Sequence, residues 1–261
     1  TNVLFNYHLD PVAMVDLREL RYQWFDYVFK GAPKPALLQS TVNYEVMGAN
    51  VWKHAPTIAA MSAGTHRIHL TAAKQTVDLT DRSDVDRVAP GGGIVDTIID
   101  TWNSIKTVSS PFATATEVSG LFSGSLDFIT NKKDFDFQIQ LYELTPKGEY
   151  VQLAPYWSRA SYVGNLTQRR LLTPGKRQHI EFTSGRLMSR EMEPGSRIVV
   201  VLGILKSPAQ QINFGTGKDV NDETVADGKE PLTIQWLGDS FIDVPVSPAR
   251  SSTASTASRP H

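Results

Sequence analysis

The feature that most constrains the fold of this chain is a change of sequence pattern at Pro56. Before it, one apolar stripe with helical spacing is followed by a single alternating segment. After it, short alternating segments are separated by glycine and proline, which is typical of an all-β sandwich or barrel. The sequence therefore predicts a mainly β protein preceded by a region of different character.

The N-terminal region predicts one helix and one strand. Asp10 before Pro11 is a typical N-cap and first-turn pair, and Gly31 is a typical stop, so we expect a helix of about 20 residues between them. A strand is expected over residues 42–47. One strand cannot cover the helix, whose natural partner is a layered α/β body largely missing from this chain. The apolar stripe of the helix consists of Met14, Leu17, Leu20, Trp24, Phe25 and Val28.

About eight strands are expected after Pro56. Residues 135–143 alternate most regularly, and residues 197–204 are apolar on both faces, which predicts a central strand. A short helix is expected over residues 96–102, after three glycines. The remaining expected strands are 67–71, 117–129, 150–153, 178–183, 232–237 and 241–246.

These patterns divide the chain into three parts. Residues 1–56 are predicted to complete a separate domain, and residues 57–246 to form the β-sandwich. Residues 247–261, rich in serine, threonine and alanine, are predicted to be a disordered tail. Because the start lacks both an initiator Met and a signal region, we expect the chain to be part of a longer protein.

Composition excludes several classes of function. With 26 basic and 27 acidic residues the net charge is −1, which argues against a nucleic-acid surface. The chain has no cysteine, so disulfides and thiolate chemistry are excluded and the compartment stays open. No apolar run approaches the roughly 20 residues of a membrane span, and none is expected.

A search for catalytic residues predicts none. The G-x-S-x-G nucleophile motif is absent, and Ser123 in the nearest run is one position out of register and within a strand. His54 and His179 are interpreted as structural, whereas His8, in a loop before the helix, is kept as a weaker candidate for a functional residue.

Metal and cofactor sites are not predicted either. His66 and His69 fall on opposite faces of a strand, so they do not converge on one ion. The run "GTGKD" at residues 215–219 is interpreted as a turn rather than a phosphate loop, and the acidic residues of 219–227 as a solvated loop rather than a calcium site.

Four aromatic residues leave an alternative open. They are expected to fill a core or an interdomain surface, although together they also suit a sugar-stacking platform. These residues are Tyr156, Trp157, Tyr162 and Trp236.

The chain resembles a known family from about Tyr7 to Val246. The start contains "LDPVAMVDLRELRYQWFDYVFKG" and then "VNYEVMGANVWKHAP", which pair WFD-x-x-x-KG with VMG-x-N-x-W. Later stretches follow in the family's order: "SGSLDF", "DFDFQIQLYELTPKGEY", "LTPGKRQHIEF", "MEPGSRIVVVLG", "INFGTGKD" and "SFIDVPV". They resemble the C-terminal part of bacterial CocE/NonD serine hydrolases, which include X-Pro dipeptidyl-peptidase, cocaine esterase, α-amino acid ester hydrolase and glutaryl-cephalosporin acylase.

This resemblance implies the fold and the partner. The helix and residues 42–47 would be the last helix and strand of an α/β-hydrolase domain, and residues 57–246 a galactose-binding-like jelly-roll β-sandwich. The resemblance implies a parent that hydrolyses acyl or aminoacyl esters or amides, X-Pro peptides among them, with a Ser-His-Asp triad. His8 lies near the position of the triad His but lacks its Gly-Pro-Trp lead-in, so no role is transferred to it.

We therefore expect this chain alone to be inactive, without cofactor, and to act by shape. Its partner would be the upstream α/β-hydrolase domain, and loops at residues 155–165 and 207–219 would wall the substrate cleft. Without that partner, self-association through the exposed helix or the sandwich is expected. The alternatives are a free-standing sandwich that binds carbohydrate or protein, and a catalyst on the sandwich itself.

Overall fold

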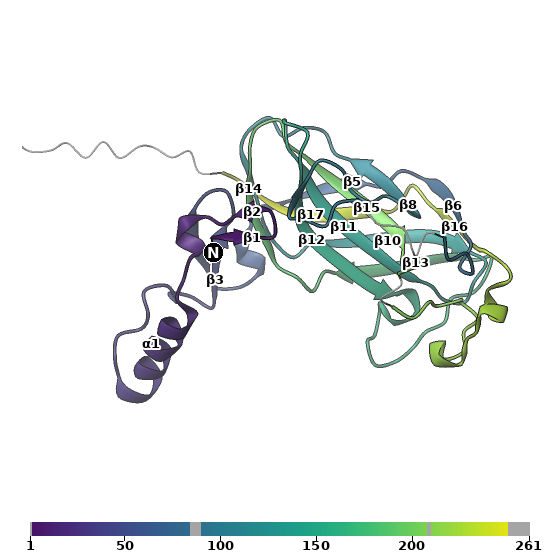
Figure 1. Cartoon of the computed structure of the whole chain (residues 1–261), viewed down its shortest axis with the longest axis horizontal. Coiled ribbons are helices and arrows are strands. Elements are labelled where there is room, and N and C mark those ends of the chain that lie inside the picture. The colour runs from purple at the N-terminus through teal and green to yellow at the C-terminus, as the bar shows by residue number, and fades with distance from the viewer. Residues whose placement is uncertain (1, 84–89, 208–209, 250–261) are drawn as a thin grey trace, which may run out of the picture.

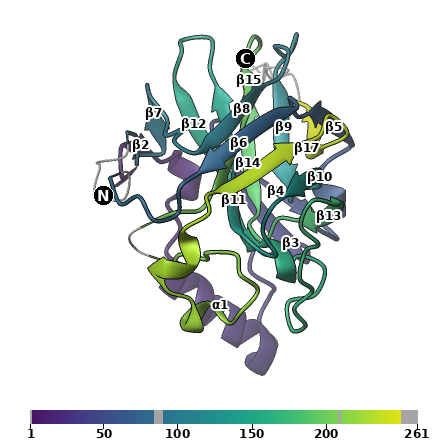
Figure 2. The same cartoon turned by 90° about the vertical axis from the view of Figure 1, so that its right-hand side faces the viewer.

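The computed structural model describes residues 2–83, 90–207 and 210–249 and shows a two-sheet β-sandwich with an N-terminal region at one end (Figure 1). Seen from the opposite end, that region lies behind the sandwich (Figure 2). All the paired strands that the structure describes are antiparallel. The mainly β prediction is confirmed.

Each sheet has its own strand order. The five-stranded sheet runs β7 (Val95–Asp96), β12 (Tyr150–Arg159), β11 (Asp136–Leu144), β15 (Arg197–Ile204), β8 (Ser104–Val108). The eight-stranded sheet runs β14 (Met188–Met192), β9 (Thr116–Gly120), β17 (Phe241–Pro248), β10 (Ser123–Thr130), β16 (Leu232–Trp236), β6 (Ala73–Val77), with β13 (Arg177–Thr183) paired to β10 and β5 (Gly64–His69) to β17.

The remaining elements are short or lie in the N-terminal region. That region holds β1 (Val3–Leu4), β2 (Tyr7–His8), α1 (Leu17–Lys30), β3 (Val42–Val46) and β4 (Val51–Ala55). Single 3₁₀ turns are η1 (Pro11–Ala13), η2 (Ala59–Met61), η3 (Ala160–Tyr162), η4 (Val220–Asp222) and η5 (Val225–Gly228).

The core lies between the two sheets, and β11 shows why the sequence builds it. Phe137, Ile139 and Leu141 are fully buried, whereas the alternate residues Gln138 and Gln140 face outward. This period-two alternation fixes one face of the strand against the opposite sheet. The adjoining core is aromatic, with ring contacts among Phe128, Phe135 and Trp236.

The prediction that residues 197–204 form a central strand is confirmed. β15 lies between β11 and β8, and both of its faces are buried. Val200 and Leu202 face the core, whereas Val199 and Val201 pack under Ile99 on the other side. The segment after β7 therefore covers part of the outer face of this sheet.

The predicted start of the N-terminal helix is wrong. α1 begins at Leu17, because the Asp16 carboxylate accepts hydrogen bonds from the amides of Arg18 and Glu19. Asp10 and Pro11 instead introduce η1, and the Asp10 carboxylate accepts from the Gly48 amide at 2.6 Å. This tertiary bond to the hairpin replaces the local cap. The predicted stop at Gly31 is confirmed, with Gly31 in the left-handed conformation at φ 68°.

The strand predicted over residues 42–47 is β3, and it forms a hairpin with β4. The turn between them uses Gly48 and Asn50, both with positive φ. The hairpin is tied to the eight-stranded sheet, because the Met47 amide donates to the Ser189 carbonyl and the Glu191 amide donates to the Met47 carbonyl. The region before Pro56 therefore contacts the sandwich directly.

Two other predictions are corrected. Residues 117–129 form β9 and β10 rather than one strand, because Gly120 at φ 132° breaks the extended backbone. Residues 96–102 contain no helix, since Asp96 ends β7 and its carboxylate accepts from the amides of Gly92 and Gly93. The side chain thereby stabilises a turn in place of a helical cap.

The C-terminal strand is longer than predicted. β17 continues through Pro248, with Ser247 paired to Glu117, so it enters the predicted tail by two positions. Residues 250–261 of that tail lie outside the described residues.

Candidate functional site

The serine and histidine residues considered for nucleophilic chemistry do not lie together in the structure. Ser123 begins β10, within the eight-stranded sheet, and His8 lies exposed in the short strand β2. His54 is bonded through Nδ1 to Asn43 Oδ1 at 2.8 Å. None of these residues makes a Ser–His pair within the described ranges.

A Ser, a His and an Asp do meet elsewhere, on β10 and β13. His179 Nδ1 lies 3.1 Å from Asp127 Oδ2 and 3.4 Å from Ser125 Oγ. A catalytic triad needs the Ser on one ring nitrogen and the Asp on the other, and here both partners share Nδ1. The cluster is therefore an ion-pair site that sequence reasoning missed, because Asp127 and His179 are distant in sequence.

Ionisation in this cluster follows from its contacts. The bond to Asp127 raises the pKa of His179. Burial favours the neutral form of Asp127, but hydrogen bonds from His179 and Arg177 outweigh it and lower the pKa of that carboxyl. An ionised Asp127 thus holds β13 to β10.

The candidate metal ligands are engaged in packing or in internal bonds. His66 lies against the ring of Phe112 and His69 against that of Phe241. Among the residues that the structure describes, no group of three His, Asp or Glu side chains is arranged to hold an ion.

The acidic segment 219–227 uses its carboxylates to shape the loop. Glu223 accepts from the amides of Phe214 and Thr216, and Asp227 forms a capping box with Thr224. Asp227 also pairs with Lys218 at 2.7 Å, and that contact lowers the pKa of its carboxyl to about 2. The carboxylate oxygens of Glu223 and Asp227 are thus engaged in bonds within the loop.

The four aromatic residues do not form one platform. Trp236 is buried in the core, and Tyr156 stacks on Phe182 with ring centroids 4.7 Å apart. Trp157, the next residue along β12, points to the opposite face and is 43% exposed. A stacking surface built from all four is therefore excluded.

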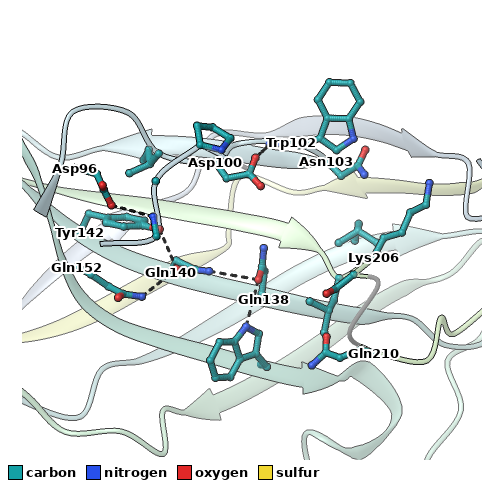
Figure 3. A pocket seen from close by; sticks show the side chains of 18 of the residues that line it. Asp96, Asp100, Trp102, Asn103, Gln138, Gln140, Tyr142, Gln152, Lys206 and Gln210 are labelled. Atoms are coloured by element: carbon teal, nitrogen blue, oxygen red, sulfur yellow. Dashed lines mark hydrogen bonds between the residues drawn. The ribbon is translucent and has the colours of Figure 1, made fainter. Parts of the chain in front are cut away.

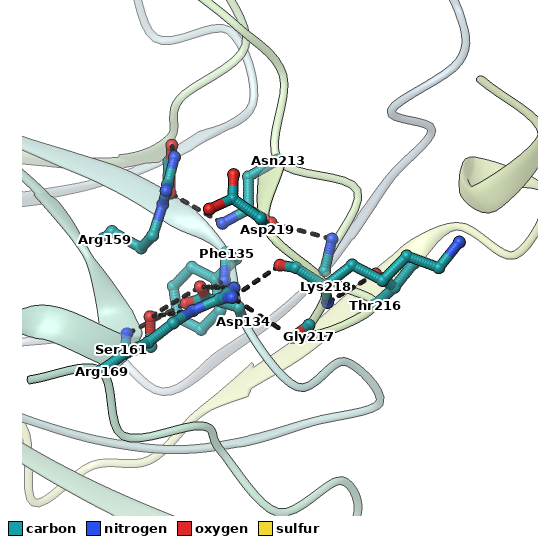
Figure 4. A network of polar contacts seen from close by, with 12 residues as sticks. Asp134, Phe135, Arg159, Ser161, Arg169, Asn213, Thr216, Gly217, Lys218 and Asp219 are labelled. Atoms are coloured by element: carbon teal, nitrogen blue, oxygen red, sulfur yellow. Dashed lines mark hydrogen bonds and ion pairs between the residues drawn. The ribbon is translucent and has the colours of Figure 1, made fainter. Parts of the chain in front are cut away.

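The loops expected to wall a cleft, residues 155–165 and 207–219, are found only in part: residues 155–159 belong to β12, and residues 208–209 lie outside the described residues. A buried charge joins residues 160–172 to residues 213–219, and we call these two segments the loop bundle. Asp134, just before β11, has no exposed surface, and its Oδ2 accepts from Arg169 Nη2 at 2.9 Å and from Ser161 Oγ at 2.7 Å (Figure 4). Its Oδ1 accepts from the amides of Phe135 and Ser161.

Arg169 extends this network across the bundle. Its Nη1 donates to the carbonyls of Gly217 and Lys218, at 3.2 and 2.6 Å. A second pair lies beside it, in which Arg159 and Asp136 form a bidentate bridge and Asn213 donates to Asp136 (Figure 4). These bonds hold two loops of distant sequence in one arrangement, which gives the surface a fixed shape.

The second candidate surface is α1 itself. None of its residues is buried, and the helix projects from the sandwich (Figure 1). Phe25 and Phe29 are adjacent on it, with ring centroids 6.0 Å apart, and Phe29 is 77% exposed. Other exposed apolar side chains on α1 are Leu17, Tyr22, Trp24, Tyr27 and Val28.

A carboxyl pair lies where the N-terminal segment meets the hairpin. Burial, together with the hydrogen bond and charge of Asp10, raises the pKa of Glu45 to about 7. Nearby, Arg190 of β14 binds the fully buried Glu143. The junction therefore depends on the protonation of Glu45.

Residues 38–235 match the model of the X-Pro dipeptidyl-peptidase C-terminal non-catalytic domain family. The chain belongs to this family. Because the match begins before β3, the hairpin falls within the matched region, and the division predicted at residue 57 stays a prediction. No curated protein matches the chain.

The chain is similar in fold to an aminopeptidase and to two hydrolases of known structure. An aminopeptidase from a Thaumarchaeota archaeon has a TM-score of 0.67 at 14% identity and matches 88% of this chain and 43% of its own. An α-amino acid ester hydrolase has a TM-score of 0.65 at 17% identity, and a CocE/NonD family hydrolase from Staphylococcus aureus has a TM-score of 0.58 at 16% identity. Each match covers 88% of this chain and 45% of the other protein's chain. This chain therefore spans less than half the length of these proteins. No helix in its described part has the length and apolar character to cross a membrane.

Proposed function

We propose that this chain is the C-terminal region of a serine hydrolase that acts on acyl or aminoacyl ester or amide bonds, X-Pro peptides among them. In this proposal the catalytic triad lies in an upstream α/β-hydrolase domain, and the sandwich stabilises that domain and shapes its cleft. The observation that carries the proposal is the exposed aromatic face of α1, a surface that water disfavours and that a hydrolase domain would bury.

The placement of the two candidate surfaces supports one docking mode. α1 and the loop bundle project from opposite ends of the sandwich toward the same side (Figures 1 and 2). A domain seated between them would bury α1 and leave the bundle at its rim. The rigid network around Asp134 suits a rim that restricts which acyl groups enter.

The test is association of the purified chain with the hydrolase domain encoded upstream, measured by sedimentation velocity. We expect a 1:1 complex, and we expect Phe25→Asp with Phe29→Asp to weaken it at least tenfold, because two buried aromatic contacts are replaced by charges. Ile98→Asp, at a side chain that is 63% exposed and lies outside α1, is the control. Unchanged affinity in the double variant would refute docking through α1.

Alone, the chain is proposed to self-associate through the same helix. Without a hydrolase domain, a second copy of the chain is the available surface that can cover the aromatic face of α1. The double variant should therefore also shift the isolated chain toward monomer, and a monomeric unmodified chain at high concentration would contradict this part of the proposal.

A further inference from the structure

The outer face of the five-stranded sheet holds a groove of about 710 Å³ (Figure 3). Its floor is made by outward-facing side chains of β11 and β12. Its walls are the segment 90–103, which covers β15, and residues 204–207 at the end of β15. The floor residues are Gln138, Gln140, Tyr142, Gln152 and Trp157.

The floor forms a hydrogen-bonded ladder. Gln138 Oε1 accepts from Trp157 Nε1 at 3.2 Å and from Gln140 Nε2 at 3.4 Å. Gln140 Oε1 accepts from the Tyr142 hydroxyl at 2.9 Å and from Gln152 Nε2 at 3.5 Å. These bonds fix the side chains before any ligand arrives, which lowers the entropy lost on binding.

The ladder leaves one hydrogen-bond donor and one acceptor without a partner inside it. Within the described residues, the donor is the side-chain amide nitrogen of Gln138 and the acceptor is the side-chain carbonyl oxygen of Gln152. A hydroxyl group both donates and accepts, so a row of hydroxyls matches such a floor.

One tryptophan of the floor and one of the wall add flat apolar surfaces. Trp157 is 43% exposed, and its indole is held by Gln138 and by the Arg186 guanidinium, 5.2 Å from the ring centroid. Across the groove Trp102 is 54% exposed. The C–H face of a sugar ring packs on such a surface, while its hydroxyls reach polar neighbours.

Charge selects against an acidic ligand. Two carboxylates, Asp96 and Asp100, line the groove. Burial, and after it the charges of these two aspartates, raise the pKa of the Tyr142 hydroxyl to about 12. Lys206 is the cation among the lining residues that the structure describes.

We propose that this groove binds a neutral oligosaccharide, with Trp157 stacked on a sugar ring and the glutamine ladder bonded to its hydroxyls. The groove lies on the outer face of the five-stranded sheet, away from α1, so this proposal does not depend on the docking of a hydrolase domain. The proposal is for binding alone and includes no chemical step.

The test is titration of the full chain with neutral hexasaccharides of β-glucan, α-glucan, mannan, xylan and galactan, followed by NMR of the tryptophan indoles. Oligogalacturonate serves as the acidic comparison and a proline-rich peptide as the alternative occupant. We expect saturable binding of at least one neutral sugar, with the largest shift at Trp157.

Variants make the result specific. Trp157→Ala and, if it unfolds, Gln138→Met should each weaken binding at least tenfold, whereas Trp24→Ala on α1 should leave it unchanged. Absence of binding across all neutral sugars, preference for oligogalacturonate or for the peptide, or full affinity in folded Trp157→Ala would each overturn the proposal.

Discussion

Asp134→Ala should be among the most destabilising single changes in this chain. The carboxylate is fully buried, accepts four hydrogen bonds, and pairs with an Arg169 side chain that is only 19% exposed. Removing one member of a buried pair leaves the other charge uncompensated, which costs about 3–5 kcal/mol. We expect a loss of about 4 kcal/mol in the free energy of unfolding, or a fall in Tm of roughly 10 °C for a chain of this size.

Guanidinium denaturation and calorimetry measure this loss, and Asp243→Ala is the matched control. Asp243 also pairs with an arginine, through a bidentate bridge to Arg67, but that arginine side chain is 50% exposed. Exposed pairs contribute about 1 kcal/mol or less, so the control should lose little. Equal losses in the two variants would refute the argument that burial of Asp134 makes the network essential. Hydrogen exchange should show faster opening of residues 160–172 in Asp134→Ala only.

Three further predictions follow from burial and ionisation. Gly124→Ala should lose about 2 kcal/mol, because a Cβ there would lie 2.7 Å from the Phe241 carbonyl, whereas Gly185→Ala, with open space around it, should lose under about 0.5 kcal/mol by thermal melts. Glu45 binds its proton more tightly when folded, so stability should fall by about 2 kcal/mol as pH rises from 4.5 to 8, and Glu45→Gln should remove that fall in urea titrations. Tyr142 should stay protonated at pH 11 in ultraviolet titration, and its ionisation at pH 10 would contradict its burial.

The sequence predicts the sandwich well where the apolar pattern of a strand is clear. β11 follows from its alternation, because one face is buried, and β15 follows from its continuous apolar run, because both faces are buried. The start of α1 could not be predicted in this way. Asp10 has the chemistry of a helix cap, but it bonds to Gly48 in the hairpin, and such a contact has no local signature.

The polar clusters were beyond sequence reasoning for the same reason. Asp134 and Arg169 are unremarkable in sequence, and only the fold brings them together. The wall loops are expected from their loop character alone, and nothing in the sequence indicates a shared anchor. The alternative of one aromatic platform fails because adjacent strand residues face opposite ways, which places Tyr156 in the core, as the main expectation has it, and Trp157 outside.

Labelling of the purified chain with a fluorophosphonate, read by intact mass, tests the central claim most directly, because an activated serine reacts whatever its natural substrate. A non-catalytic domain predicts an unmodified mass after prolonged incubation, with Ser125 unlabelled beside His179. A stoichiometric adduct would contradict the account, since it would show that this chain carries an active serine of its own.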